Sequence, residues 1–304
     1  MVPPHRRGRL AAPGLEHPLN TLPDFDDRQP WGAFAPAGLH RLLLALSHRV
    51  PRALRRLVFA LRRPIKYGVH QPLDVLIWGL RLRLLPRGNT SEVKLLFAPQ
   101  LFDRDELQLL AQRLRPGSVF IDIGANVGAY SFWAHCCTGG AGRILAVEPD
   151  PEMRRRLQFN LDANRMADVT VCPVALSDQD GEGSLLVNPQ QRGENTLVAA
   201  QASLAGGQRT VQKVRLQTLL ALLNEHGVTQ IDALKIDIEG HEPPVLTHFF
   251  QHAAPTLWPG VVITEYKRET AALIDALFVQ RGYQRVLFNG LNQAYARGAP
   301  GAAP

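Results

Sequence analysis

Cysteine is scarce in this sequence of 304 residues, and its three cysteines match no familiar chemical pattern. Cys136, Cys137 and Cys172 have neither the paired spacing of a zinc site nor the even number of a disulfide framework. Long apolar runs are also missing: no stretch reaches the roughly eighteen apolar residues of a membrane-spanning helix, and no apolar segment follows the charged N-terminal residues. We therefore expect buried thiols in a cytoplasmic protein that has no signal peptide and does not span a membrane.

Acidic residues are absent between Asp27 and Asp74, in a part of the chain that is rich in arginine. Pro51 can begin a helix there, on which arginines flank an apolar stripe. Basic amphipathic helices can lie on membrane surfaces, but packing of the stripe on the protein's own core or on a second subunit is the favoured interpretation. Residues 40–66 are therefore a candidate contact with the inner membrane surface or with a subunit. The stripe consists of Leu54, Leu57, Val58 and Leu61.

Composition divides the chain into four parts. Residues 1–38, rich in proline and glycine, are expected to be disordered or loosely packed. Residues 39–95 are predicted to form a basic helical extension or lid, 96–297 one α/β domain, and 298–304 a flexible tail. Within the domain, residues 181–207 are expected to be an irregular insert that shapes a binding pocket. Nucleic-acid binding is not expected, because stacking aromatic side chains do not alternate with the arginines.

A dinucleotide-binding fingerprint is also lacking, although the chain contains a glycine turn. An apolar run with β-branched residues precedes Gly124, which predicts a buried parallel strand whose carboxyl end faces a ligand crevice. The fingerprint needs glycine where this sequence has Asn126 and Ala129. The pattern that remains is Asp122-x-Gly124-x-x-x-Gly128.

A second predicted strand ends in Glu148, about twenty residues beyond the glycine turn. At this spacing a carboxylate can accept hydrogen bonds from the ribose hydroxyls of a nucleoside cofactor. Asp150 can cap the following helix, whose Arg154, Arg155 and Arg156 are expected to point to water.

Charged residues crowd another predicted apolar strand near residue 235. Lys235, Asp237 and Glu239 lie among residues with the alternation of a buried strand, and polar groups in such a strand usually mark a site. Glu265 ends a further apolar run, at the same expected edge of the sheet. The sequence therefore predicts a cluster of carboxylates at the carboxyl ends of the strands.

Together with the glycine turn, the segment Lys-Ile-Asp-Ile-Glu-Gly-His-Glu at residues 235–242 resembles the FkbM family of S-adenosylmethionine-dependent methyltransferases. That family carries Lys-Ile-Asp-(Val/Ile)-Glu-Gly-x-Glu as a signature, and the resemblance covers roughly residues 95–288. It implies a Rossmann-like class I methyltransferase fold: a mostly parallel sheet flanked by helices, with an antiparallel strand at the C-terminal end. A hairpin over residues 283–296 would supply that strand.

The resemblance also implies S-adenosyl-L-methionine as cofactor and, usually, methylation of a hydroxyl oxygen on a sugar, glycan or secondary metabolite. Asp122 would lie beside the methionine end of the cofactor and Glu148 at its ribose. Ser177 or Asp178 would bind the adenine amino group, although both residues could simply cap a turn. The predicted cofactor-binding residues are Asp122, Gly124, Ala125, Asn126, Gly128, Tyr130, Glu148, Ser177 and Asp178.

Transfer to oxygen requires a positioned hydroxyl and a group that accepts its proton. Asp237 is the first candidate for base or orienting carboxylate, with Glu239 and Glu265 as alternates. His241 is a further candidate base, for which a role at a helix start is favoured. Oxygen ligands such as Asp237 and Glu239 could hold a divalent cation, but the family pattern does not require one and we assign no metal. The predicted acceptor-binding residues are Asn195, Thr196, Lys235, His241 and Glu242.

Two other functions stay open at this point. A nicotinamide-dependent oxidoreductase can be built on the same kind of sheet, although the missing glycines count against it. A non-catalytic module could instead dock to a membrane or a partner through its basic helices. Neither the acceptor nor the oligomeric state follows from the sequence.

Overall fold

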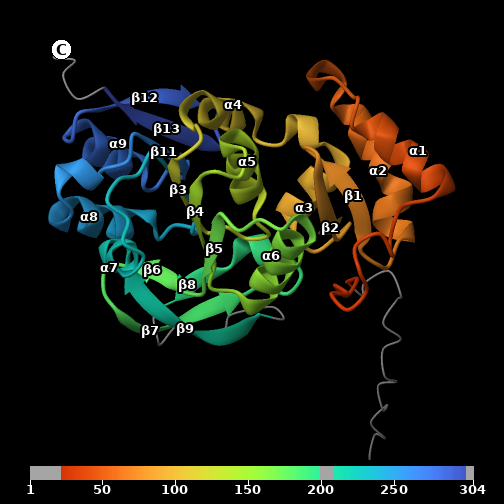
Figure 1. Cartoon of the computed structure of the whole chain (residues 1–304), viewed down its shortest axis with the longest axis horizontal. Coiled ribbons are helices and arrows are strands. Elements are labelled where there is room, and N and C mark those ends of the chain that lie inside the picture. Colours follow the sequence, from red (N-terminus) through yellow and green to blue (C-terminus); the bar gives the residue numbers. More distant parts are fainter. Residues whose placement is uncertain (1–21, 199–208, 299–304) are drawn as a thin grey trace, which may run out of the picture.

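A seven-stranded sheet lies at the centre of the structure, a computed structural model that describes residues 22–198 and 209–298 (Figure 1). Its strands are β3 (Val119–Ile123), β4 (Arg143–Val147), β5 (Val169–Cys172), β10 (Ala233–Ile236), β11 (Val261–Glu265), β12 (Tyr283–Phe288) and β13 (Asn292–Arg297). In space they follow the order β12, β13, β11, β10, β3, β4, β5, and β11 through β5 run parallel. β13 is antiparallel to both of its neighbours, so the predicted fold class is confirmed.

Helices cover both faces of this sheet. Successive side chains of a strand point to opposite faces, and the strands carry apolar side chains on both, so each face needs a covering layer. Phe120 of β3 joins the apolar core on one face and Ile121 joins the core on the other. Side chains of α4, α5 and α6 fill the first core, and those of α7, α8 and α9 the second. The bounds are α4 Arg104–Arg113, α5 Ala129–Thr138, α6 Pro151–Asn164, α7 Leu219–Glu225, α8 Glu242–His252 and α9 Ala271–Val279, with a 3₁₀ turn at Pro255–Leu257.

A second sheet of four strands lies beside the first, in the order β6, β9, β7, β8. These strands are β6 (Ala175–Ser177), β7 (Gly181–Val187), β8 (Thr196–Val198) and β9 (Thr210–Thr218), and a 3₁₀ turn spans Arg192–Glu194. The irregular insert predicted for 181–207 is therefore wrong for the seven residues of β7 and the three of β8. Backbone pairing with β9 orders β7, and that partner is more than twenty residues away along the chain. The end of the predicted insert lies outside the described residues.

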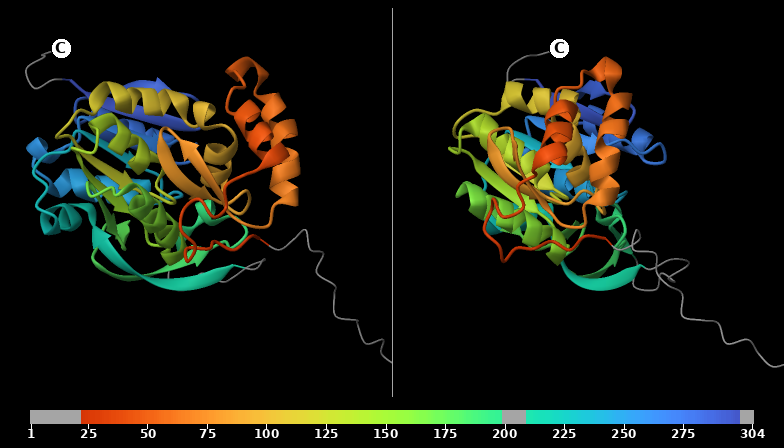
Figure 2. Two further views of the ribbon diagram at one scale, coloured as in Figure 1. Left: turned by 45° about the vertical axis from the view of Figure 1, so that its right-hand side comes forward. Right: turned by 90° about the vertical axis from the view of Figure 1, so that its right-hand side faces the viewer.

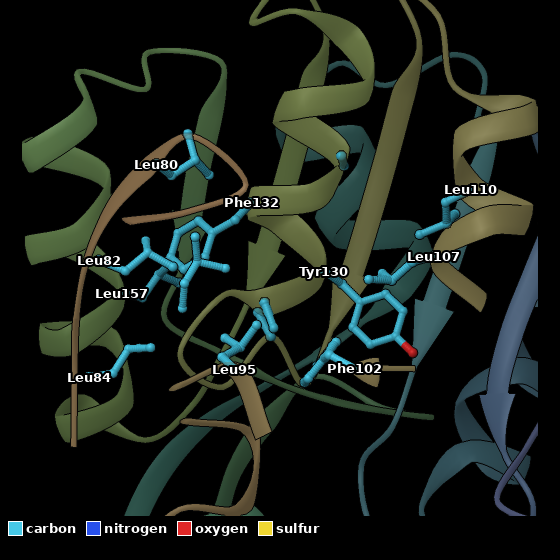
Figure 3. Packing of buried hydrophobic residues seen from close by; sticks show 14 of the residues in the cluster. Leu80, Leu82, Leu84, Leu95, Phe102, Leu107, Leu110, Tyr130, Phe132 and Leu157 are labelled. Atoms are coloured by element: carbon cyan, nitrogen blue, oxygen red, sulfur yellow. The ribbon is translucent and has the colours of Figure 1, made fainter. Parts of the chain in front are cut away.

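The N-terminal elements pack directly on the main domain. They are α1 (Gly38–Ser47), a 3₁₀ turn (Arg52–Leu54), α2 (Arg56–Gly68), β1 (Leu73–Ile77), β2 (Leu80–Leu84), α3 (Thr90–Phe97) and a 3₁₀ turn (Pro99–Leu101). Leu82 and Leu84 of β2 share one apolar core with Phe132 of α5 and Leu157 of α6 (Figure 3). No core boundary therefore separates residues 39–95 from the rest. Among the described residues, no helix is both long and apolar enough to cross a membrane.

Residues 22–37 differ from the loosely packed tail that composition predicts. Arg83 and Asp74, both on the β1–β2 hairpin, form an ion pair with fully buried side chains and an Nε–Oδ1 distance of 2.7 Å. Arg83 also donates to three carbonyl groups of this segment, and Asp74 accepts from two of its amides. The carbonyl groups belong to Asp26, Gln29 and Pro30, and the amides to Gly32 and Phe34. Residues 1–21 of the predicted tail lie outside the described residues.

Arg156 is buried, which corrects the prediction that it points to water. Its guanidinium contacts Glu92 of α3 and Glu152 of its own helix α6. Burial raises the pKa of Glu92, and the neighbouring Arg156 opposes that rise. The pair fastens α3 to α6, and the side-chain oxygen of Asn89 caps α3 through the amide of Glu92.

Replacing Arg83 with methionine should lower the free energy of unfolding by about 3–5 kcal/mol, because the Asp74 carboxylate would stay buried without its charged partner. Urea denaturation followed by circular dichroism measures this. Arg52→Gln is the control: its side chain is 63% exposed and 3.9 Å from the nearest carboxylate oxygen of Asp105. That change should cost less than about 1 kcal/mol. Equal costs for the two variants would contradict a structural role of the buried pair.

Candidate active site

A pocket of about 370 Å³ opens at the carboxyl ends of the parallel strands. Parallel strands end at one edge of a sheet, so Gly124, Glu148, Asp237 and Glu265, which follow or end four of them, share its wall. Ten of the predicted site residues line the pocket. They are Gly124, Ala125, Asn126, Tyr130, Glu148, Asn195, Lys235, Asp237, Glu239 and Glu265.

Seven predicted site residues lie away from the pocket wall, namely Asp122, Gly128, Ser177, Asp178, Thr196, His241 and Glu242. Most of them instead bond to neighbouring protein groups. His241 Nε2 lies 3.2 Å from Ser177 Oγ, and burial lowers the pKa of His241. Thr196 donates its hydroxyl to the backbone oxygen of Glu239 at 3.3 Å. Glu242 accepts from the backbone amides of residues 238 and 240 at the start of α8.

The glycine turn is shaped by close contact between two strands. Gly124 has a φ of +72°, and a Cβ there would overlap the carbonyl oxygen of Asp237. The amide of Asp237 donates to the carbonyl of Ile123 at 3.1 Å, so the ends of β3 and β10 are held together. At Gly128, with a φ of +92°, a Cβ would overlap the Leu157 side chain. Gly124 therefore allows the ends of β3 and β10 to approach each other closely, and Gly128 allows the Leu157 side chain of α6 to pack against the turn.

Lys235 connects the glycine turn to two carboxylates. Its Nζ lies 3.8 Å from an oxygen of Asp122 and 3.8 Å from an oxygen of Asp237, and donates to the carbonyl of Gly124 at 2.9 Å. Asp122 is fully buried and accepts from the amide and the hydroxyl of Ser131 at 3.0 and 2.7 Å. Burial raises the pKa of Asp122, and Lys235 opposes that rise. Asp122 thus holds the first turn of α5 behind the pocket wall.

Glu148 is a buried carboxylate on the pocket wall. One of its oxygens accepts from the amide of Asn126 and the other from the amide of Asp150, each at 2.8 Å. Burial raises the pKa of Glu148 to about 7, against the effect of these two amides. Each oxygen has two acceptor positions, so one on each remains available to a ligand.

Asp150 fastens the 192–195 segment to the start of α6. It caps α6 as predicted, by accepting from the amide of Glu152 at 2.9 Å. It also accepts from Arg192 Nη1 and from Asn195 Nδ2, each at 2.8 Å. Arg192 was not predicted, and nothing in the local sequence distinguishes it from other loop arginines.

Asp237, Glu239 and Glu265 meet on one side of the pocket with Lys267. Lys267 Nζ lies 2.8 Å from Glu239 and 2.9 Å from Glu265. Burial and the charge of Asp237 raise the pKa of Glu265 to about 7, while Lys267 opposes the rise. Burial also raises the pKa of Glu239, which has a φ of +56°. The sequence reasoning missed Lys267, although its position two residues after a strand end was a usable signal.

Carboxylate oxygens of Asp237, Glu242 and Glu265 lie within 4.8 Å of one another, a spacing that could suit a metal ion. Glu242, however, already accepts two backbone amides, and Lys267 and Lys235 contact the other two acids. The ammonium groups of Lys235 and Lys267 therefore already place positive charge beside Asp237 and Glu265, where a metal ion would otherwise do so.

The charges on the pocket wall favour a ligand that carries no phosphate. Five acids and three basic residues line it, and each base contacts an acid of the protein. The acids are Asp103, Glu148, Asp237, Glu239 and Glu265; the bases are Lys94, Arg192 and Lys235. Lys94 and Asp103 were not predicted, because their positions depend on how α3 and the start of α4 pack against the sheet.

A family model described as the methyltransferase FkbM domain matches residues 122–285, more than half of the chain. The 31-O-demethyl-FK506 methyltransferase FkbM of Streptomyces tacrolimicus is 28% identical over 234 residues, which cover 66% of this chain and 86% of that protein. The AMB antimetabolite synthetase AmbE of Pseudomonas aeruginosa is 27% identical over 218 residues. This match covers 60% of this chain and spans only 10% of the length of that synthetase.

Among solved structures, a precorrin-6y C5,15-methyltransferase from Geobacter metallireducens aligns with a TM-score of 0.41 and 14% identity. The alignment covers 64% of this chain and 89% of that one.

Gly124→Ala should destabilise the protein more than Gly139→Ala, although both glycines have similar positive φ angles, +72° and +61°. Both changes place a Cβ in the left-handed region, at a cost of about 1–2 kcal/mol. Only at Gly124 would the Cβ also overlap backbone, whereas nothing lies within 4 Å at Gly139. Urea denaturation of the two variants measures the difference, and equal losses would contradict the close approach of β3 and β10.

Proposed function

The chain belongs to the FkbM methyltransferase family, and on this premise we propose that it transfers the methyl group of S-adenosyl-L-methionine to a hydroxyl oxygen of a sugar, glycan or secondary metabolite. The observation that carries the proposal is the buried Glu148 carboxylate on the pocket wall, with one acceptor position left on each oxygen. A pair of ribose hydroxyls would use both positions. The 31-O position in the name of the Streptomyces relative supports oxygen as the acceptor atom.

The rest of the wall also fits this cofactor. Apolar side chains suitable for an adenine ring line the pocket at Val174, Ala175, Leu176, Leu185 and Leu197. The excess of acids over bases suits a ligand that carries an ammonium and a sulfonium group. When bound, S-adenosyl-L-methionine supplies an electrophilic methyl group. The protein's part is to position the acceptor oxygen and to take up its proton.

Asp237 and Glu265 are the groups we assign to the acceptor. Asp237 orients the hydroxyl, and Lys235 at 3.8 Å stabilises its negative charge. Glu265 accepts the proton, because a base is most effective when its pKa lies near the working pH and the pKa of Glu265 is raised to about 7. Lys267 holds Glu265 and Glu239 in place from outside the pocket wall. Asn195, which bonds to Asp150, offers an uncharged group to a polyol acceptor.

A nicotinamide dinucleotide fits this site less well. Its pyrophosphate would need the amino end of the helix after the glycine turn. Here the buried Asp122 carboxylate accepts a hydrogen bond from the Ser131 amide in the first turn of that helix, α5, so this amide is not available to a pyrophosphate. Asn126 and Ala129 replace the second and third glycines of the fingerprint.

Calorimetry should detect binding of S-adenosyl-L-methionine, but not of NAD, to the full chain. Glu148→Ala should raise the dissociation constant at least about tenfold, because hydrogen bonds to a charged group contribute about 1.5–3 kcal/mol each. Glu182→Ala, on an exposed part of β7, is the matched control and should bind normally. Binding of NAD alone would favour the oxidoreductase instead.

For wild-type enzyme, the rate of methyl transfer should rise with pH through about 7 and then level off, because Glu265 acts in its ionised form. Glu265→Gln should lower the rate about 10²–10⁴-fold and abolish this rise, with cofactor affinity unchanged. Glu269→Gln, an exposed acid four residues further along, should behave as wild type. A wild-type pH profile in Glu265→Gln would remove this residue from the chemistry.

The acceptor can be found by incubating the enzyme with methyl-labelled S-adenosyl-L-methionine and a metabolite extract. Mass spectrometry of the labelled products should reveal a methyl ether that survives mild alkali. A label found only on nitrogen or carbon would contradict transfer to oxygen.

A further inference from the structure

Residues 38–68 fold into a pair of helices, α1 and α2, joined by a short 3₁₀ turn; we call this unit the basic hairpin. It stands at one end of the molecule, beyond β1 and β2 (Figures 1 and 2). None of its residues lines the pocket described above.

The basic hairpin carries all of the net positive charge of the protein. It contains seven arginines, one lysine and no acid, whereas the whole chain has a net charge of +7, so the remaining residues together carry −1. Of the eight bases, only Arg52 lies within 4 Å of an acid in the described part of the chain. Six of the eight are exposed to solvent, namely Arg41, Arg49, Arg52, Arg55, Arg56 and Arg63.

The same hairpin also exposes large apolar side chains. Seven of the fourteen exposed large apolar residues in the described structure belong to it, although it makes up about a tenth of the chain. Leu39, Leu42 and Leu46 share one face of α1 and are 63%, 55% and 44% exposed. The other four are Leu54, Leu57, Phe59 and Tyr67. The apolar stripe predicted for packing is therefore only partly buried: Val58 is covered, while Leu54 and Leu57 are about half exposed.

The basic hairpin is fixed to the element that leads to the pocket. His48 Nε2 lies 2.8 Å from the carbonyl oxygen of Leu96, and Gln100 donates to the carbonyl groups of Ser47, which ends α1, and of Val50 in the following loop. Leu96 lies on α3, which also contributes Thr90, Ser91 and Lys94 to the pocket wall. A surface that binds the hairpin would therefore hold the pocket in a defined orientation relative to that surface.

We propose that the basic hairpin docks the protein on an anionic lipid bilayer. Leucines of α1 would enter the headgroup region while the arginines contact lipid phosphates, which uses both exposed features at once. A second copy of the chain fits this face less well. A symmetric interface would bring two sets of eight positive charges together without one acid from either hairpin. A nucleic acid would engage the arginines but leave the exposed leucines in water.

Vesicle co-sedimentation of the full chain tests this proposal. Binding is expected to vesicles of equal parts phosphatidylglycerol and phosphatidylcholine, to weaken as salt is raised, and to be undetectable with phosphatidylcholine alone. This measurement needs no methyl acceptor, so its failure would leave the proposed methyl transfer untouched.

Two sets of variants separate the charged and apolar contributions. Arg55→Gln, Arg56→Gln and Arg63→Gln together should lower the partition coefficient about 100-fold, at about fivefold per arginine near the surface. Leu42→Ser with Leu46→Ser should lower it at least about tenfold. Arg113→Gln and Leu273→Ser, which change exposed residues on α4 and α9, should bind as wild type. Unchanged melting temperatures confirm that each variant is folded.

Three outcomes would overturn the proposal. The first is no binding to the anionic vesicles at low salt, and the second is equal binding to both kinds of vesicle. The third is a dimer in solution that Leu42→Ser with Leu46→Ser dissociates, because the exposed face would then be a subunit interface.

Discussion

The Lys235 ammonium group is the contact on which the arrangement of the site depends. It lies between Asp122 of β3 and Asp237 after β10, and it binds the carbonyl of the glycine turn. A buried positive charge is tolerated only with such partners, so each partner is held where the ammonium group requires it. Asp122 then fixes the start of α5, and Asp237 is presented to the pocket.

A second set of buried polar contacts brings the N-terminal region into the same structure. Arg83 and Asp74 hold the segment before α1 against the β1–β2 hairpin, and Arg156 with Glu92 joins α3 to α6. Unpaired, each of these charges would strongly destabilise the fold. As a result, α3 reaches the pocket wall, and the basic hairpin is attached to the catalytic domain through a shared apolar core.

The two functional proposals make use of different physical properties of the protein. On the pocket wall, four of the five acids and all three basic residues contact a group of opposite charge within the protein. The basic hairpin is open, and most of its arginines contact no acid in the described part of the chain. Long-range attraction to an anionic surface is therefore available there and is absent at the pocket.

The family, the mostly parallel sheet and ten residues of the pocket wall could be predicted from the amino-acid sequence. These features follow from short segments, because a strand, its turn and the next helix are encoded within about ten neighbouring residues. Glycine positions likewise report local backbone geometry.

Other features of the site and of the N-terminal region depend on tertiary packing. It placed Asp122 behind the wall, brought Lys94, Arg192 and Lys267 to the site, and buried Arg83 and Arg156. It also left Leu54 and Leu57 exposed on a helix whose pattern predicted burial. In each case the outcome depends on a partner far away in the chain, and periodicity along one segment carries no information about which partner that is.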